Sequence, residues 1–121
     1  MKTGDFKSAD AAAQQLIANA KDPKETAIAH DERGTVLLSE GMSKNKEEFY
    51  ADADKEFKAA LAAYPNFPMA YYADGLALAR LKQDEAAKSQ FEHYIAMTKE
   101  ETADRGRARR YVERPELASR S

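Results

Sequence analysis

The 121-residue chain contains no cysteine and no tryptophan, and it has only five glycines and four prolines. The absence of cysteine excludes disulfides, thiolate metal sites and a cysteine nucleophile. It does not identify a compartment, because a cysteine-free domain is stable in either redox environment. No apolar run approaches the length that spans a bilayer, and residues 1–6 contain no apolar signal core. We therefore expect no membrane insertion, and the sequence leaves the localisation open.

An excess of charge of one sign is also missing, since 19 basic residues face 21 acidic ones. This balance implies neither nucleic acid nor an anionic membrane as a partner. There is no glycine-rich phosphate loop and no Gly-x-Ser-x-Gly motif. The two histidines, His30 and His93, have no second ligand at helical metal spacing, so structural roles are expected for them. The sequence thus predicts no enzyme, no metal and no cofactor.

The residues that are present favour helices almost throughout. Alanine is abundant and β-branched residues rarely cluster. Breaks are expected at Asp22-Pro23, at residues 64–68, at the polar turn 82–84 and at Pro115. The predicted helices span residues 6–20, 24–43, 46–63, 68–81, 84–98 and 101–113. Because the connecting segments are short, neighbouring helices should pack antiparallel, so the predicted fold class is an all-α stack of helix hairpins without strands.

Small and aromatic residues recur at a fixed interval. A first triad lies 34 residues before a second one: Ala53, Phe57 and Ala60, then Ala87, Phe91 and Tyr94. Within each triad the spacing i, i+4, i+7 places the three side chains on one helix face. A small alanine lets two helices approach closely, and the aromatic side chain one turn later fills the space beside it. We therefore expect Ala53 and Ala87 to be buried at helix crossings.

A glycine precedes each triad, but with a longer interval. Gly34 and Gly75 are 41 residues apart, seven more than the interval between the triads. Seven residues correspond to about two helical turns, so an insertion of this size keeps the apolar face in register. We expect the additional residues to lengthen the helices between Gly34 and Ala53.

With this 34-residue period, and with Tyr71, Gly75, Ala87 and Phe91 in one unit, the chain resembles the tetratricopeptide repeat (TPR) family. The resemblance covers residues 4–98 and implies a superhelical α-solenoid. It divides a single domain, residues 1–121, into a half repeat 4–20, a repeat with longer helices 24–65, a repeat 68–98 and a capping helix 101–114. The chain departs from the family pattern at Asp74, Tyr94 and Lys99, where the family has Leu, Ala and Pro.

The resemblance also implies a partner site. TPR domains bind a protein or peptide on a concave surface lined mainly by the first helix of each repeat. Carried over to this chain, that surface consists of Ile28, Asp31, Thr35, Leu38, Met69, Tyr72, Leu76, Ala79 and Arg80. We therefore expect a protein–protein interaction module, with Tyr72 and Arg80 as the main contacts. Arg80 alone fits the cationic clamp by which some members grip a terminal carboxylate, so that subtype is not expected.

The arginine-rich tail, residues 105–118, is similar to one that follows bacterial TPR segments joined to a thioredoxin-like (redoxin) domain. This similarity implies that the natural protein continues beyond Ser121, and that the segment is a structural or dimerising part of it. Acidic residues surround the arginines, so we expect residues 101–114 to form a salt-bridged cap in which Tyr111 and Val112 cover the last hairpin. Binding of nucleic acid by the arginine tail is the remaining alternative.

Overall fold

The computed structural model describes residues 5–113, and these form six helices and no strand. The helices are α1 (Phe6–Asn19), α2 (Pro23–Lys44), α3 (Glu47–Ala63), α4 (Pro68–Arg80), α5 (Asp84–Met97) and α6 (Ala103–Glu113). The predicted all-α fold class is confirmed, and each of these helices begins and ends within two residues of its predicted bounds. The predicted break at Pro115 lies outside the described residues. None of the described helices is long and apolar enough to cross a bilayer.

The helix ends follow from local chemistry. The Asp22 side chain accepts a hydrogen bond from the backbone N–H of Glu25 at 2.8 Å, and this caps the N-terminus of α2. Pro23 follows in the first turn, where its missing N–H costs no helical hydrogen bond. At the other end, Asn45 has a φ of 53°, and this left-handed residue stops the helix. In the polar turn between α4 and α5, Lys82 also adopts the left-handed conformation, with a φ of 62°.

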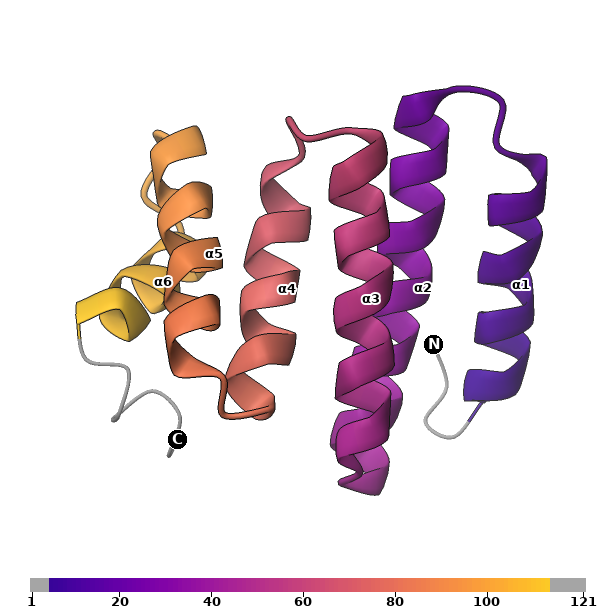
Figure 1. The fold of residues 1–121 in the computed structure, drawn as a ribbon, viewed down its shortest axis with the longest axis horizontal. Coiled ribbons are helices and arrows are strands. Elements are labelled where there is room, and N and C mark those ends of the chain that lie inside the picture. Colours follow the sequence, from indigo (N-terminus) through magenta and orange to yellow (C-terminus); the bar gives the residue numbers. More distant parts are fainter. Residues whose placement is uncertain (1–4, 114–121) are drawn as a thin grey trace.

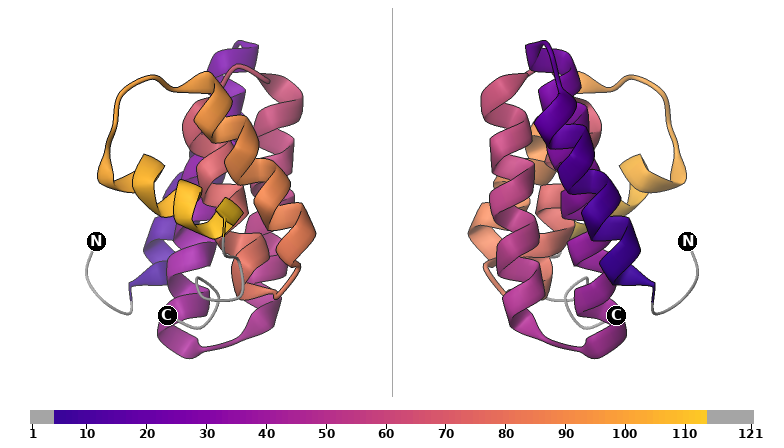
Figure 2. Two further views of the ribbon diagram at one scale, coloured as in Figure 1. Left: turned by 90° about the vertical axis from the view of Figure 1, so that its left-hand side faces the viewer. Right: turned by 90° about the vertical axis from the view of Figure 1, so that its right-hand side faces the viewer.

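The helices form an antiparallel stack in which each one packs chiefly against its neighbours in sequence (Figure 1). The helices α2 and α3 form one hairpin and α4 and α5 the next, with α1 at one end and α6 at the other (Figure 1). Helix α6 lies on the side of the stack opposite α3 (Figure 2). The hairpin stack is thus established, whereas its superhelical twist stays a prediction.

Each hairpin is held together by the same close contact. A Cβ atom at Gly34 would lie 2.5 Å from Cε1 of Phe57, and one at Gly75 would lie 2.7 Å from Cε1 of Phe91. No real Cβ atom tolerates such a distance, so only glycine lets the ring lie against the facing helix. The predicted helix crossings are confirmed, because Ala53 and Ala87 are both fully buried.

The seven additional residues lengthen the first hairpin, as predicted. Helix α2 has 22 residues and α4 has 13, while α3 has 17 and α5 has 14. The extension repeats the contact that the core of the hairpin uses, because a Cβ atom at Gly41 would lie 2.8 Å from Cε1 of Tyr50. The two helices therefore stay close up to the turn at Asn45.

Gly75→Ala and Gly34→Ala should each lower the free energy of unfolding by roughly 1–3 kcal/mol, because the added methyl group overpacks the contact with the phenylalanine ring. Urea denaturation followed by circular dichroism measures the change. Gly106→Ala is the matched control, since a Cβ atom there meets only the end of the Arg110 side chain, at 3.9 Å. In this open position on α6, alanine should stabilise the helix by up to about 1 kcal/mol. A Gly75→Ala variant as stable as the unmodified protein would contradict the close contact.

Candidate functional site

Exposed apolar side chains gather on one side of α2 and α4. Ile28 and Met42 of α2 are 45% and 52% exposed, and Met69 of α4 is 45% exposed. They are three of the four large apolar side chains that are exposed within residues 5–113, and the fourth is Leu16 of α1. Ile28, Thr35 and Met42 follow one another at intervals of seven residues, so they form a single stripe along α2. Exposed apolar surface of this kind commonly marks a binding site.

The stripes of α2 and α4 lie on the same side of the stack. The two helices are parallel, because α3 runs antiparallel between them. Ala27 of α2 clusters with Ala70 of α4, and Leu38 clusters with Ala77. Around the axis of each helix, the exposed stripe is rotated by about a quarter of a turn from these clustered residues, in opposite senses on the two helices, so both stripes point to one side. We call this surface the α2/α4 face and define it by Ile28, Asp31, Thr35, Met42, Met69, Leu76 and Arg80.

The residues that the TPR resemblance assigned to a concave surface divide into three groups. Exposed ones are Ile28, Thr35, Met69 and Arg80, half-buried ones are Asp31, Leu76 and Ala79, and buried ones are Leu38 and Tyr72. Leu38 is buried because it belongs to the row of α2 that packs against α4, not to the exposed stripe. Sequence reasoning missed Met42, although its spacing of seven residues from Thr35 could have identified it.

The prediction that Tyr72 is a free contact residue is wrong. Its side chain is 4% exposed and packs in the core with Phe91 and Tyr94, whose ring centroids lie 5.8 and 5.1 Å from its own. The hydroxyl oxygen accepts a hydrogen bond from Nη1 of Arg107 at 2.9 Å. Burial raises the pKa of the Tyr72 hydroxyl, and this effect outweighs the hydrogen bond from Arg107, which lowers it. Helix α6 therefore occupies the position where a partner would have reached Tyr72.

Helix α6 is fixed to the second hairpin through its aromatic side chain. The ring of Tyr111 lies 5.0 Å from that of Phe91, and its hydroxyl donates a hydrogen bond to Oδ1 of Asp84 at 2.5 Å. Val112 is packed against the same core cluster. The cap formed by Tyr111 and Val112 is thus present.

Three of the four arginines of α6 have partners among the described residues. Arg105 and Arg109 both donate to Oε1 of Glu101, and Arg107 bonds to Asp104 as well as to Tyr72. Arg105 also donates to the carbonyl oxygen of Ile95 at the end of α5, at 3.4 Å. These contacts favour the capping role over phosphate binding. The rest of the tail, from Arg114 onward, lies outside the described residues, so the structure describes only residues 105–113 of the segment that resembles a redoxin-associated tail.

Asp31 is the acidic member of the α2/α4 face. Its Oδ1 atom is buried and has no hydrogen-bond partner within the described residues. Burial of the carboxyl group, and secondarily the negative charge of Glu32, raise its pKa to about 6. No cation contributes to this pKa. The free protein therefore holds a carboxylate on this face that its own chain does not neutralise.

A second acidic group with a raised pKa joins the two hairpins. Asp74 is fully buried, and its Oδ2 atom accepts a hydrogen bond from Nε2 of Gln90 at 2.6 Å. The Oδ1 atoms of Asp74 and of Asp54 are both buried and have no donor within the described residues, and the Asp54 carboxyl group pairs through Oδ2 with Lys58 at 3.0 Å. The two carboxyl groups are close enough to interact with each other. Two carboxyl oxygens can bond only if one of them carries a proton. Burial, and secondarily the interaction with Asp54, raise the pKa of Asp74 to about 8.

The histidines take part in packing and in ion pairs. Nδ1 of His30 lies 2.8 Å from Oε1 of Glu56, and Nη1 of Arg33 donates to Oε2 of the same carboxylate at 3.1 Å. Arg33 also donates to Asp10 at 2.8 Å, so this network joins α1, α2 and α3. His93 stacks on the ring of Tyr71. Within the part of the chain that the structure describes, no three side chains of the metal-ligating types converge.

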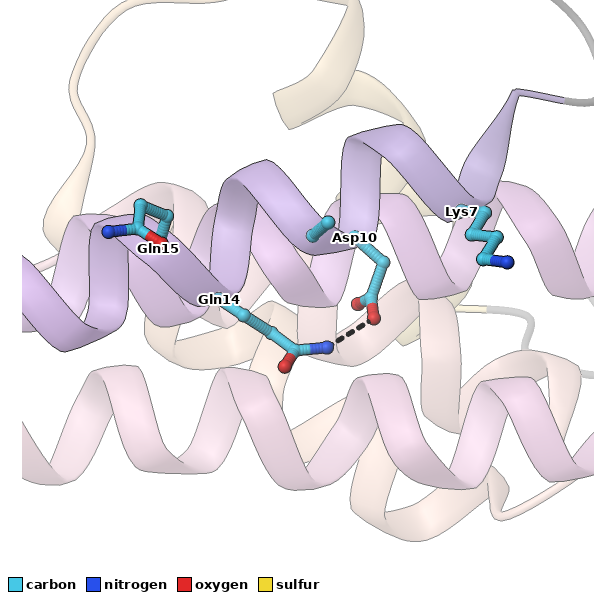
Figure 3. A pocket seen from close by; sticks show the side chains of 5 residues that line it. Lys7, Asp10, Gln14 and Gln15 are labelled. Carbon is cyan, nitrogen blue, oxygen red and sulfur yellow. Dashed lines mark hydrogen bonds between the residues drawn. The ribbon is translucent and has the colours of Figure 1, made fainter.

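An open hollow on α1 carries no convergent chemistry (Figure 3). Its lining residues all come from that one helix: Lys7, Asp10, Ala11, Gln14 and Gln15. Asp10 is already engaged, because its Oδ2 atom accepts a hydrogen bond from Gln14 at 2.6 Å and its Oδ1 atom accepts one from Arg33. The α2/α4 face is therefore the stronger candidate for a binding site.

Comparison of the chain with protein-family models, curated proteins and solved structures gave no match in any of the three.

Tyr72→Ala should lower the free energy of unfolding by about 3–5 kcal/mol, because it leaves a cavity beneath α6. Arg80→Ala changes an exposed residue and should stay within about 0.5 kcal/mol of the unmodified protein. Chemical denaturation of both variants measures the difference. Equal stability of the two variants would mean that α6 does not cover Tyr72.

The buried acid pair makes stability depend on pH. An unfolded aspartate has a pKa near 3.8 and folded Asp74 has one of about 8, so the folded state binds more protons between these values. The contribution of Asp74 to the free energy of unfolding is therefore greatest at low pH, and it decreases as the pH rises toward 8. Between pH 6 and 8 we expect a slope of up to about 1.4 kcal/mol per pH unit. Urea denaturation at a series of pH values measures it.

Asp74→Asn should abolish this slope, because the amide can donate to Asp54 and accept from Gln90 without a shared proton. Asp31→Asn is the control. The Asp31 carboxyl group has a pKa of about 6, so its titration changes the free energy of unfolding only below about pH 6. The slope between pH 6 and 8 should therefore persist in the Asp31→Asn variant. A slope that survives in Asp74→Asn would refute the proton-sharing pair.

Proposed function

We propose that the chain is a TPR-type protein–protein interaction module that binds a peptide or an extended segment of a partner protein along the α2/α4 face. The observation that carries the proposal is the concentration of exposed apolar side chains on this face. An amphipathic helix that packs into a single-domain core normally turns such residues inward. Here Ile28, Met42 and Met69 face solvent, although their helices are otherwise well packed.

The repeated packing unit supports the TPR-type assignment. Gly34 lies against Phe57 in the first hairpin as Gly75 lies against Phe91 in the second, with a buried alanine four residues before each ring. A stack of equivalent hairpins buries the contacts between neighbours and leaves the first helices of the hairpins side by side. These helices are α2 and α4, which carry the exposed stripes.

The chemistry of the face is suited to a peptide. Methionine side chains adapt their shape to varied apolar partners. Thr35 and Arg80, which are both exposed, offer polar groups beside them. The residues of the α2 stripe follow one another at intervals of about two turns, roughly 10 Å, which is about the length of three residues of an extended segment.

Selection from a library of random twelve-residue peptides, displayed on phage and captured on the immobilised protein, tests this function. We expect peptides with apolar residues to be enriched. Their affinity should fall about tenfold or more in the double variant Ile28→Ser/Met69→Ser, because two apolar contacts are lost. Both positions are exposed, so the variant should remain folded, as circular dichroism can verify.

Leu16→Ser is the matched control for this experiment. Leu16 is 50% exposed, as apolar and as accessible as Ile28 and Met69, but it lies on α1. Its replacement should leave the affinity of the selected peptides unchanged. A library that yields no binder, or peptides that bind the double variant as tightly as the unmodified protein, would contradict the proposed function.

A further inference from the structure

The α2/α4 face contains one carboxyl group with a buried oxygen that has no partner among residues 5–113, that of Asp31. Asp31 lies one helical turn after Ala27, on nearly the same side of α2 as Ala27 and Leu38. The residues of α4 in the clusters to which Ala27 and Leu38 belong are apolar: Ala70, Ala73, Leu76 and Ala77. The Asp31 carboxyl group is therefore largely desolvated beside the exposed stripe.

This arrangement costs the free protein stability. The buried Oδ1 atom of Asp31 has lost its water and gained no hydrogen bond within the described residues. Its nearest charged influence is Glu32, which repels it. Other acidic groups of α2 and its neighbours are neutralised locally, as Glu56 is by Arg33 and Asp54 is by Lys58. Asp31 is thus unlike them in that the compensating cation is missing.

From this juxtaposition we propose that Asp31 is a cation-binding subsite of the α2/α4 face, which anchors a lysine or arginine side chain of the bound segment while neighbouring apolar residues of that segment contact Ile28 and Met69. This inference rests on the proposed function and adds the charge of the partner to it. A cation placed against the accessible side of the half-buried carboxylate compensates the charge that no group among the described residues neutralises. It thus recovers on binding the free energy that the free protein loses.

The peptides selected with the immobilised protein provide the test. Lysine or arginine should be enriched beside apolar residues. For one synthetic peptide from this set, calorimetry should show a loss of affinity of about tenfold or more on Asp31→Asn. Changing the basic residue of the peptide to glutamine should cost as much with the unmodified protein and little with Asp31→Asn, because both changes remove the same interaction.

Two further readouts separate recognition from a structural role. Asp31→Asn should leave the free protein as stable or make it more stable at neutral pH, while it weakens binding, because it removes a desolvated charge. Glu32→Gln is the matched charge control. Glu32 is the exposed neighbour of Asp31 in the sequence, so its replacement should change affinity less than twofold. Affinity for the basic peptide should also fall as pH drops below 6 in the unmodified protein and not in Asp31→Asn.

The outcomes distinguish this inference from the proposed function. Peptides that bind through Ile28 and Met69 but show no basic residue, and that bind Asp31→Asn as tightly as the unmodified protein, would overturn the cation subsite and leave the binding function standing. Equal losses of affinity in Asp31→Asn and Glu32→Gln would also overturn it, since they would reflect general charge attraction. A library without any binder would overturn both.

Discussion

The fold depends on the close approach of two helices at a glycine. In each hairpin a phenylalanine ring lies where the Cβ atom of any other residue would stand, at Gly34 in the first and at Gly75 in the second. This contact brings the helix axes together and buries an alanine one turn before each ring. Because it recurs, the two hairpins have similar inner faces and can stack. The parallel arrangement of α2 and α4, and the exposed face that they share, follow from that stacking.

Polar interactions connect the two hairpins, each of which is held together by a glycine–phenylalanine contact. The carboxyl groups of Asp74 and Asp54 interact where α4 meets α3, and Gln90 connects Asp74 to α5. A buried pair of this kind stabilises less than well-packed apolar residues would. Oδ1 of Asp31, in contrast, has neither a hydrogen-bond partner nor a neighbouring acid to share a proton with among residues 5–113. Asp74, which has a partner, thus connects two hairpins, whereas Asp31 is the aspartate that we propose binds a ligand.

The sequence predicted the elements well, because their signals are local. Proline, glycine and the spacing of apolar residues set the helix bounds, and the 34-residue period identified the crossings at Ala53 and Ala87. It could not predict that Tyr72 is buried, since whether a helix face is free depends on where a later helix lies. The path of α6 is determined by the contacts of Arg107 and Tyr111, 35 or more residues further along the chain. The pairing of Asp74 with Asp54 was hidden for the same reason.

Both hairpins contain the same glycine–phenylalanine contact, and nuclear Overhauser spectroscopy of the isotopically labelled protein tests whether the two contacts exist. We expect strong cross-peaks between the α-protons of Gly34 and the ring of Phe57, and between those of Gly75 and the ring of Phe91. The α-protons of Gly106 should show none to an aromatic ring. The absence of either glycine–phenylalanine cross-peak would contradict the repeated unit, and with it the arrangement of α2 and α4 on which the binding face depends.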